Sequence, residues 1–256
     1  MNPMLTFNEA QVMQWITPFI WPFVRVLALF SSMPILSHRS IPTRVKVALA
    51  FLITIGAQAS LPEIPVINLN SSEALWVLLQ QILMGVCLGF AVRLVFAAVA
   101  LAGDLIGTQM GLNFAIFFDP GMGGQLTSLA RFLGTITSFF FVSMNGHLIL
   151  ISAVVKSFEI FPVSSEPFSF LRELKPHLWG AEIFTMALWM ALPLTSVLLF
   201  TNVVLGVISR VASSLQIFSI GFPVTVGVGL FGLYLSLPSM QAPFTVMLEH
   251  MLARFQ

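Results

Sequence analysis

Charged side chains make up only 8% of this 256-residue chain, whereas 57% of its residues are hydrophobic. Soluble globular domains carry roughly 25% charged residues. A chain with so few charges cannot cover a water-facing surface, so it needs lipid or other protein around it. The mean hydropathy of +0.97 agrees. The composition therefore predicts an integral membrane protein.

Other absences exclude further classes. The net charge of +1 gives no electrostatic basis for binding nucleic acid, and the single cysteine, Cys87, excludes an intrachain disulfide. The sequence contains no H-E-x-x-H, no G-x-S-x-G and no phosphate-binding loop. The first basic residue is Arg25, so the N-terminus lacks the positive region of a signal peptide. We expect no catalysis, no cofactor, no metal and no cleavage.

About six apolar segments follow one another along the chain, as expected for an all-α membrane protein. They lie at 15–36, 47–62, 74–102, 132–155, 183–209 and 215–238, followed by an amphipathic C-terminal piece at 239–256. A membrane span needs about 20 residues, which the segment at 47–62 does not reach. We predict one membrane domain, 1–256, built of helical hairpins.

Prolines interrupt several of these segments: Pro18, Pro22 and Pro34 in the first, Pro193 in the fifth, and Pro223 in the last. Membrane helices tolerate proline where neighbouring protein satisfies the freed carbonyls. We therefore expect kinked helices packed against partners, rather than rods surrounded by lipid.

Two arginines lie inside apolar segments, Arg25 and Arg93. A charge at the middle of a bilayer costs about 2.5–3.5 kcal/mol on insertion scales. Each arginine therefore either extends to the membrane surface or faces a polar interior with an acidic partner. For Arg93 we favour a polar or protein-facing position near Gly89.

Two apparent motifs have simpler explanations. Gly227, Gly229 and Gly232 spell G-x-G-x-x-G, but they lie in an apolar segment without the βαβ context of a dinucleotide site. Asp104 and Asp119 could suggest an intramembrane aspartyl protease. Asp104 ends a segment, however, and Asp119 begins the turn sequence Asp-Pro-Gly.

Glycines spaced four residues apart form bare stripes on a helix, where another backbone can approach closely. Gly85 and Gly89 form one stripe, and Gly103, Gly107 and Gly111 form a second. We predict that both stripes are helix-packing faces, within the chain or against a partner.

The stretch 110–124 joins two apolar segments without being polar itself. Its bulky apolar residues and its glycines suggest a pore plug formed by Met110, Phe114, Phe117, Phe118, Gly121 and Met122. Apolar side chains on a loop can close a pore by excluding water, and methionine adapts to irregular gaps. A packing loop without a gating role is the alternative that these residues leave open.

At this stretch the sequence resembles the FliR family of flagellar export components, which also covers related virulence-type secretion systems. The resemblance rests on short motifs in a fixed order: Met33-Pro34 with Arg39-x-x-Pro42, Gly107-Thr108-Gln109-Met110-Gly111-Leu112, Asp119-Pro120-Gly121, Asn145-Gly146-His147, Ala191-Leu192-Pro193, and Leu215-Gln216-Ile217-Phe218 with Gly221-Phe222-Pro223. Ser213-Ser214 stand where the family commonly has a proline.

The resemblance implies a subunit of the type III export gate in the bacterial inner membrane, at the flagellar basal body. FliR-like proteins assemble with FliP and FliQ into a hetero-oligomeric, helical, pore-forming complex, and FlhB surrounds its cytoplasmic opening. Unfolded flagellar subunits pass through the centre, which the loop matching 110–124 plugs.

The rival interpretation is a small-solute or ion transporter. Such a protein needs a midplane cluster of ionisable or unwound polar groups, often within inverted repeats. The sequence has isolated charges instead.

Overall fold

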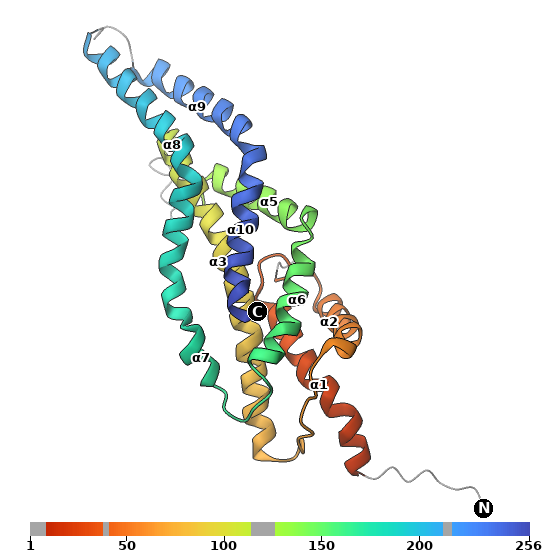
Figure 1. Ribbon diagram of the computed structural model, residues 1–256. Coiled ribbons are helices and arrows are strands. Elements are labelled where there is room, and N and C mark those ends of the chain that lie inside the picture. Colours follow the sequence, from red (N-terminus) through yellow and green to blue (C-terminus); the bar gives the residue numbers. More distant parts are fainter. Residues whose placement is uncertain (1–8, 38–40, 114–125, 212–216) are drawn as a thin grey trace, which may run out of the picture. The chain divides into compact units, whose positions relative to one another are not determined.

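The computed structural model describes residues 9–37, 41–113, 126–211 and 217–256, and these residues form helices with no strand. The helices are α1 (Glu9–Ser32), α2 (Thr43–Ala57), α3 (Ser72–Gln109), α5 (Ser128–Ser143), α6 (Gly146–Ile160), α7 (Ser169–Leu174), α8 (Trp179–Val211), α9 (Ile217–Ser236) and α10 (Gln241–Leu252), with short 3-10 turns at Gln58–Ser60, Pro176–Leu178, Leu237–Met240 and Ala253–Phe255 (Figure 1). The all-α prediction is confirmed.

Four helical stretches of the described residues are long and apolar enough to cross a membrane. They are Met13–Ser32, Ser72–Gln109, Ser169–Val211 and Ile220–Phe255, and α5 and α6 together add a broken fifth candidate. The 15-residue α2 rises only about 22 Å, less than the ~30 Å hydrocarbon core, and is not among them. The prediction of a multi-pass membrane protein is confirmed.

The apolar segment predicted at 132–155 is two helices rather than one. The break falls at Met144 and Asn145, where Asn145 has a left-handed backbone with φ 55°. The next position needs glycine, Gly146, because a Cβ there would lie 2.7 Å from the Phe141 ring and 2.8 Å from the Phe141 carbonyl oxygen. Hydropathy alone cannot detect this break, since both flanks are equally apolar.

Most of the prolines in the apolar segments lie inside helices and do not end them. Pro18 and Pro22 lie within α1, Pro193 lies within α8, and Pro223 lies within α9. The last apolar run instead breaks at Leu237–Met240, a 3-10 turn that contains Pro238.

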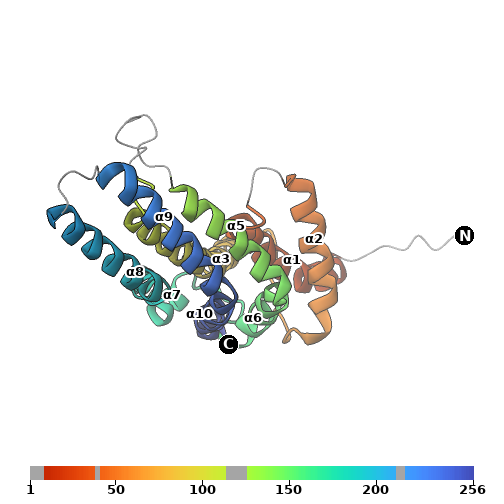
Figure 2. The same cartoon turned by 90° about the horizontal axis from the view of Figure 1, so that it is seen from above.

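The contacts divide the chain into two compact units. The first unit contains residues 1–93, 147–178 and 249–256. Here α1 packs on α2, and the Phe19 and Phe51 rings meet edge to face at 5.2 Å, as Figures 1 and 2 show for the two helices. On its other side α1 approaches α3 at Gly85 and Gly89.

The second unit contains residues 94–146 and 179–248. Phe141 on α5 and Phe244 on α10 are buried in its core, and the half-buried Phe96 ring lies 6.2 Å from the first and 5.9 Å from the second. Helices α8 and α9 form a hairpin and lie side by side in both views (Figures 1 and 2). Gly232 of α9 makes room for Leu194 of α8.

Candidate functional site

Of the predicted plug residues, the structure describes only Met110, which follows the end of α3. Met110 is 0% exposed, and its side chain packs where a Cβ of Gly229 would lie, at 2.6 Å from Cγ and Sδ. Phe114, Phe117, Phe118, Gly121 and Met122 lie outside the described residues. The structure therefore describes the two ends of this connection, and those ends form the candidate site.

The last turn of α3 closes in a glycine-dependent motif. Gly111 has φ 79°, and its N–H donates to Thr108 O at 3.0 Å. The Leu112 N–H donates to Gly107 O at 2.9 Å. This pair of bonds is the Schellman arrangement, whose left-handed residue is usually glycine.

The predicted role of Gly111 on a helical stripe is therefore corrected, because α3 ends at Gln109. Gly111 reverses the chain direction beyond the helix instead of presenting a bare helical face. A spacing of four residues cannot distinguish a third helical glycine from a C-terminal cap.

Two further carbonyls at this helix end receive hydrogen bonds from distant helices. Asn202 of α8 donates from Nδ2 to Gln109 O at 3.1 Å, and Thr225 of α9 donates from Oγ1 to Met110 O at 3.3 Å. A helix leaves its last four carbonyls without intrahelical partners. Here the Schellman bonds satisfy two of them, and the α8–α9 hairpin satisfies the other two.

The opposite end of the connection is held by Asp104. Its Oδ1 accepts from the Thr127 N–H at 3.0 Å and from the Thr127 hydroxyl at 2.8 Å. Thr127 Oγ1 in turn accepts from Ala130 N at 3.1 Å, which caps the N-terminus of α5. A carboxylate at this helix end also interacts favourably with the helix dipole. Asp104 thus has a structural role, and it is bonded to Thr127 rather than to a second acid.

Glycines 103 and 107 allow α5 to start close to α3. A Cβ at position 103 would lie 2.7 Å from Ala130 Cα, and one at position 107 would lie 3.2 Å from Thr127 Oγ1. In the first unit, a Cβ at Gly85 would meet Arg25 O and would lie 2.7 Å from Ala28 Cβ. At Gly89 it would meet the Ser32 hydroxyl.

Arg25 lies in the first unit and is 0% exposed. It donates from Nε to Gln81 Oε1 at 2.7 Å, from Nη1 to Ser157 Oγ at 2.9 Å, and from Nη2 to Phe161 O at 3.1 Å. The guanidinium also lies over the Phe158 ring, 3.6 Å from its centroid. Both alternatives predicted for Arg25 are wrong, because the side chain is buried rather than extended to the surface and its partners are neutral rather than acidic. Arg93 is exposed.

The residues that sequence reasoning missed are polar side chains among apolar neighbours: Gln80, Gln81, Ser157, Asn202 and Thr225 within helices, and Thr127 at the N-cap of α5. Their isolation is the signal that could have found them. A polar group placed among apolar neighbours is costly unless it has a hydrogen-bond partner.

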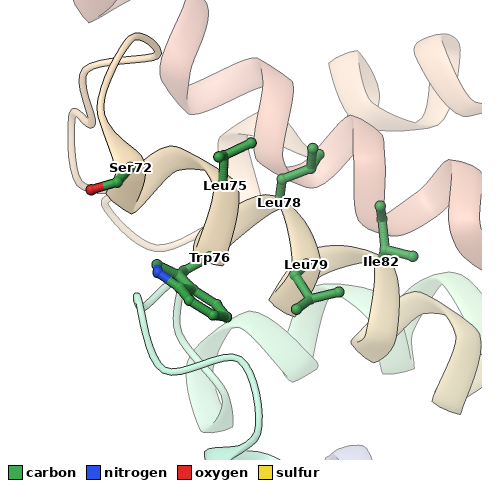
Figure 3. A pocket seen from close by; sticks show the side chains of 6 residues that line it. All are labelled: Ser72, Leu75, Trp76, Leu78, Leu79 and Ile82. Carbon is green, nitrogen blue, oxygen red and sulfur yellow. The ribbon is translucent and has the colours of Figure 1, made fainter.

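A groove of about 580 Å³ runs along the first turns of α3 (Figure 3). It is lined by Ser72, Leu75, Trp76, Leu78, Leu79 and Ile82. Apart from Ser72 these side chains are apolar, so the groove is an apolar surface. Among the residues described, no group of three His, Cys, Asp or Glu could hold a metal ion.

Comparison with known proteins identifies the family. Residues 16–251 match the model of the bacterial export proteins, family 1. The chain is 44% identical over 235 residues to a flagellar biosynthetic protein FliR of Pectobacterium carotovorum subsp. carotovorum, covering 92% of this chain and 90% of the relative. It is 44% identical over 243 residues to the FliR of Escherichia coli K12, covering 94% and 92%. The FliR of Bacillus subtilis 168 is 27% identical over 213 residues, covering 82% of each chain. This chain therefore belongs to the FliR family of bacterial export proteins.

Proposed function

We propose that this chain is a structural and gating subunit of the flagellar type III export channel, and that it acts without catalysis or a cofactor. It is a multi-pass inner-membrane component of the flagellar export apparatus. The observation that carries the gating role is the connection after α3. Its sequence is apolar, and the structure holds the residues on either side of it.

A channel for unfolded protein must hold back ions and protons when it is empty. An apolar constriction does this because filling it with water is unfavourable. In this proposal Met110, Phe114, Phe117, Phe118 and Met122 form the constriction, and Gly121 lets the backbone turn within it. Passing unfolded flagellar subunits displace these side chains.

The partners proposed are FliP and FliQ in the gate, with FlhB at its cytoplasmic entrance. The hairpin of α8 and α9 supports an assembly with other helices, because much of its apolar surface is uncovered. Phe200 is 71% exposed and Tyr234 is 75% exposed. Large exposed apolar surfaces indicate lipid or protein contact.

The transporter alternative is not supported by the described residues. Among these residues the buried charged side chain is that of Arg25, and its hydrogen-bond acceptors are neutral. A binding site for a coupled ion would need several ionisable or unwound polar groups at one depth.

The test replaces Phe117 and Phe118 with Ser in the full chain, co-expressed with its gate partners. Cytoplasmic pH, followed with a pH-sensitive fluorescent protein after an external acid pulse, reports proton leak. We expect a leaky membrane with normal co-purification of the partners, because hydroxyl groups let water enter the constriction. Normal assembly without a rise in leak would show that the connection only packs.

A further inference from the structure

Three positions of the α8–α9 hairpin converge on the last residues of α3. Asn202 bonds Gln109, Thr225 bonds Met110, and Gly229 leaves space for the Met110 side chain. Thr225 and Gly229 are four residues apart, so they share one face of α9. A backbone carbonyl and the side chain of the same residue are therefore both received by that face.

The two polar side chains are unusual in their helices. Asn202 is the one amide side chain in the 33-residue α8, and Thr225 is buried within an apolar helix. Asn202 is half-buried and Thr225 is buried, and a buried polar group without a partner is unfavourable. Asn202 bonds the last residue of α3, and Thr225 bonds the residue that follows it. Packing alone would be served by Leu or Val at either position.

The Thr225 contact has a built-in alternative. The hydroxyl oxygen lies 3.3 Å from Met110 O but 3.0 Å from Phe222 O in its own helix. Its single proton can be donated to either carbonyl, so releasing Met110 does not leave the hydroxyl unsatisfied. Because Phe222 O can replace Met110 O as the acceptor, the contact between Thr225 and Met110 can break and form again without leaving the hydroxyl unpaired.

We infer that Asn202 and Thr225 are positioning residues through which the α8–α9 hairpin holds the end of α3, at Gln109 and Met110, in its resting place. We name this pair the hairpin latch. Its consequence for the channel rests on the proposed gating function, whereas the latch itself rests on the contacts above.

The experiment compares Asn202→Leu, Thr225→Val and the double variant with the unaltered chain, each co-expressed with its gate partners. Thr225→Ser keeps the hydroxyl and should restore the unaltered behaviour. Thr201→Val is the matched control on α8, because the Thr201 hydroxyl donates to Val197 O of its own helix. Co-purification of the partners establishes that each variant assembles.

The direct measurement is thiol labelling next to the latch. The chain has one cysteine, Cys87, which is buried, so Leu112→Cys provides a single accessible thiol. We expect labelling by a maleimide to rise about threefold in each single variant and about tenfold in the double variant, if each hydrogen bond contributes about 0.7 kcal/mol. Proton leak, measured by the acid-pulse assay, should rise in parallel.

The outcomes separate the latch from the gate. Unchanged labelling in an assembled double variant overturns the latch, and a leak caused by the Phe117 and Phe118 substitutions would leave the proposed function standing. Raised labelling without leak supports the latch and contradicts the gating role of the connection. Equal effects of Thr201→Val and Thr225→Val would also overturn the latch.

A second pair of variants covers the case in which the polar substitutions prevent assembly. Gly229→Ala places a Cβ against the Met110 side chain, whereas Gly227→Ala has nothing within 4 Å. We expect Gly229→Ala, and not Gly227→Ala, to raise labelling at position 112. Equal labelling in the two variants would count against the latch.

Discussion

In each compact unit, helical side chains hold a non-helical connection, but they hold it differently. In the first unit, Arg25 bonds Phe161 O, and Gln80 bonds Pro162 O, Ser164 Oγ and the Ser164 N–H. Successive residues after α6 are thus fixed. In the second unit, the described bonds hold the chain at 109–110 and again at 127. The bonds of the first unit hold successive residues of a connection, whereas the described bonds of the second unit lie at the two ends of a connection whose residues 114–125 are outside the described part of the chain.

The difference follows from what an apolar environment demands. Irregular backbone within apolar surroundings is tolerated only where protein satisfies its polar groups. The first unit meets this demand with long side chains that reach from α1 and α3. We therefore expect that replacing the polar residues of the first unit lowers the free energy of unfolding. Replacing those of the second unit should instead change the position of the chain near Leu112.

Arg25→Met should have the largest effect on stability. The variant leaves Gln81 Oε1, Ser157 Oγ and Phe161 O without their donor, and buried unsatisfied groups cost about 1–3 kcal/mol each. Three such acceptors predict a loss of at least about 3 kcal/mol, seen as a lower melting temperature of the purified complex or as no accumulation. Arg25→Lys should rescue little, because an ammonium group lacks the planar fork that reaches three partners.

A stable Arg25→Met complex that leaks protons would reverse the comparison, since it would assign a gating role to the first unit. If Arg25→Met lowers the melting temperature without changing the labelling of Leu112→Cys, the comparison between the two units stands.

Gly103→Ala should have an intermediate effect. The added methyl would lie 2.7 Å from Ala130 Cα, a backbone atom, so α5 must move away from α3. Overpacking of this kind costs about 1–3 kcal/mol. Gly134→Ala on α5 is the matched control, since nothing lies within 4 Å of its Cβ position. Alanine there should be neutral or stabilise the helix by up to about 1 kcal/mol.

Thermal unfolding of both variants in the purified complex measures the difference. Equal melting temperatures would mean that α5 is not closely packed on α3. A Gly134→Ala variant that loses its gate partners would instead mark position 134 as a subunit contact.

The sequence predicts the apolar helices well, because hydropathy reports directly on membrane insertion. It does not predict the break at Asn145, the end of α3 before Gly111, or the neutral partners of Arg25. Each depends on a contact between residues distant in the sequence or on a backbone angle. Gly111 shows the limit most clearly, since the same four-residue spacing fits a helical stripe and a helix cap. The role of 110–124 as a plug stays a prediction.

Replacing Asp104 should lower the free energy of unfolding least, but it should clearly change how the chain is held at Thr127. Asp104→Ala removes the acceptor for both the N–H and the hydroxyl of Thr127, which costs about 1–2 kcal/mol in total for partly buried groups. Asp104→Asn keeps a side-chain oxygen and loses only the charge near the start of α5, worth about 0.3–1 kcal/mol. The two variants therefore separate hydrogen bonding from charge. If Asp104 anchors the end of the connection, Asp104→Ala should raise proton leak with little change in melting temperature, and Asp104→Asn should retain most of the resting seal. A melting temperature that falls as far as that of Arg25→Met, with no leak, would mean that the second unit uses its polar groups in the same way as the first.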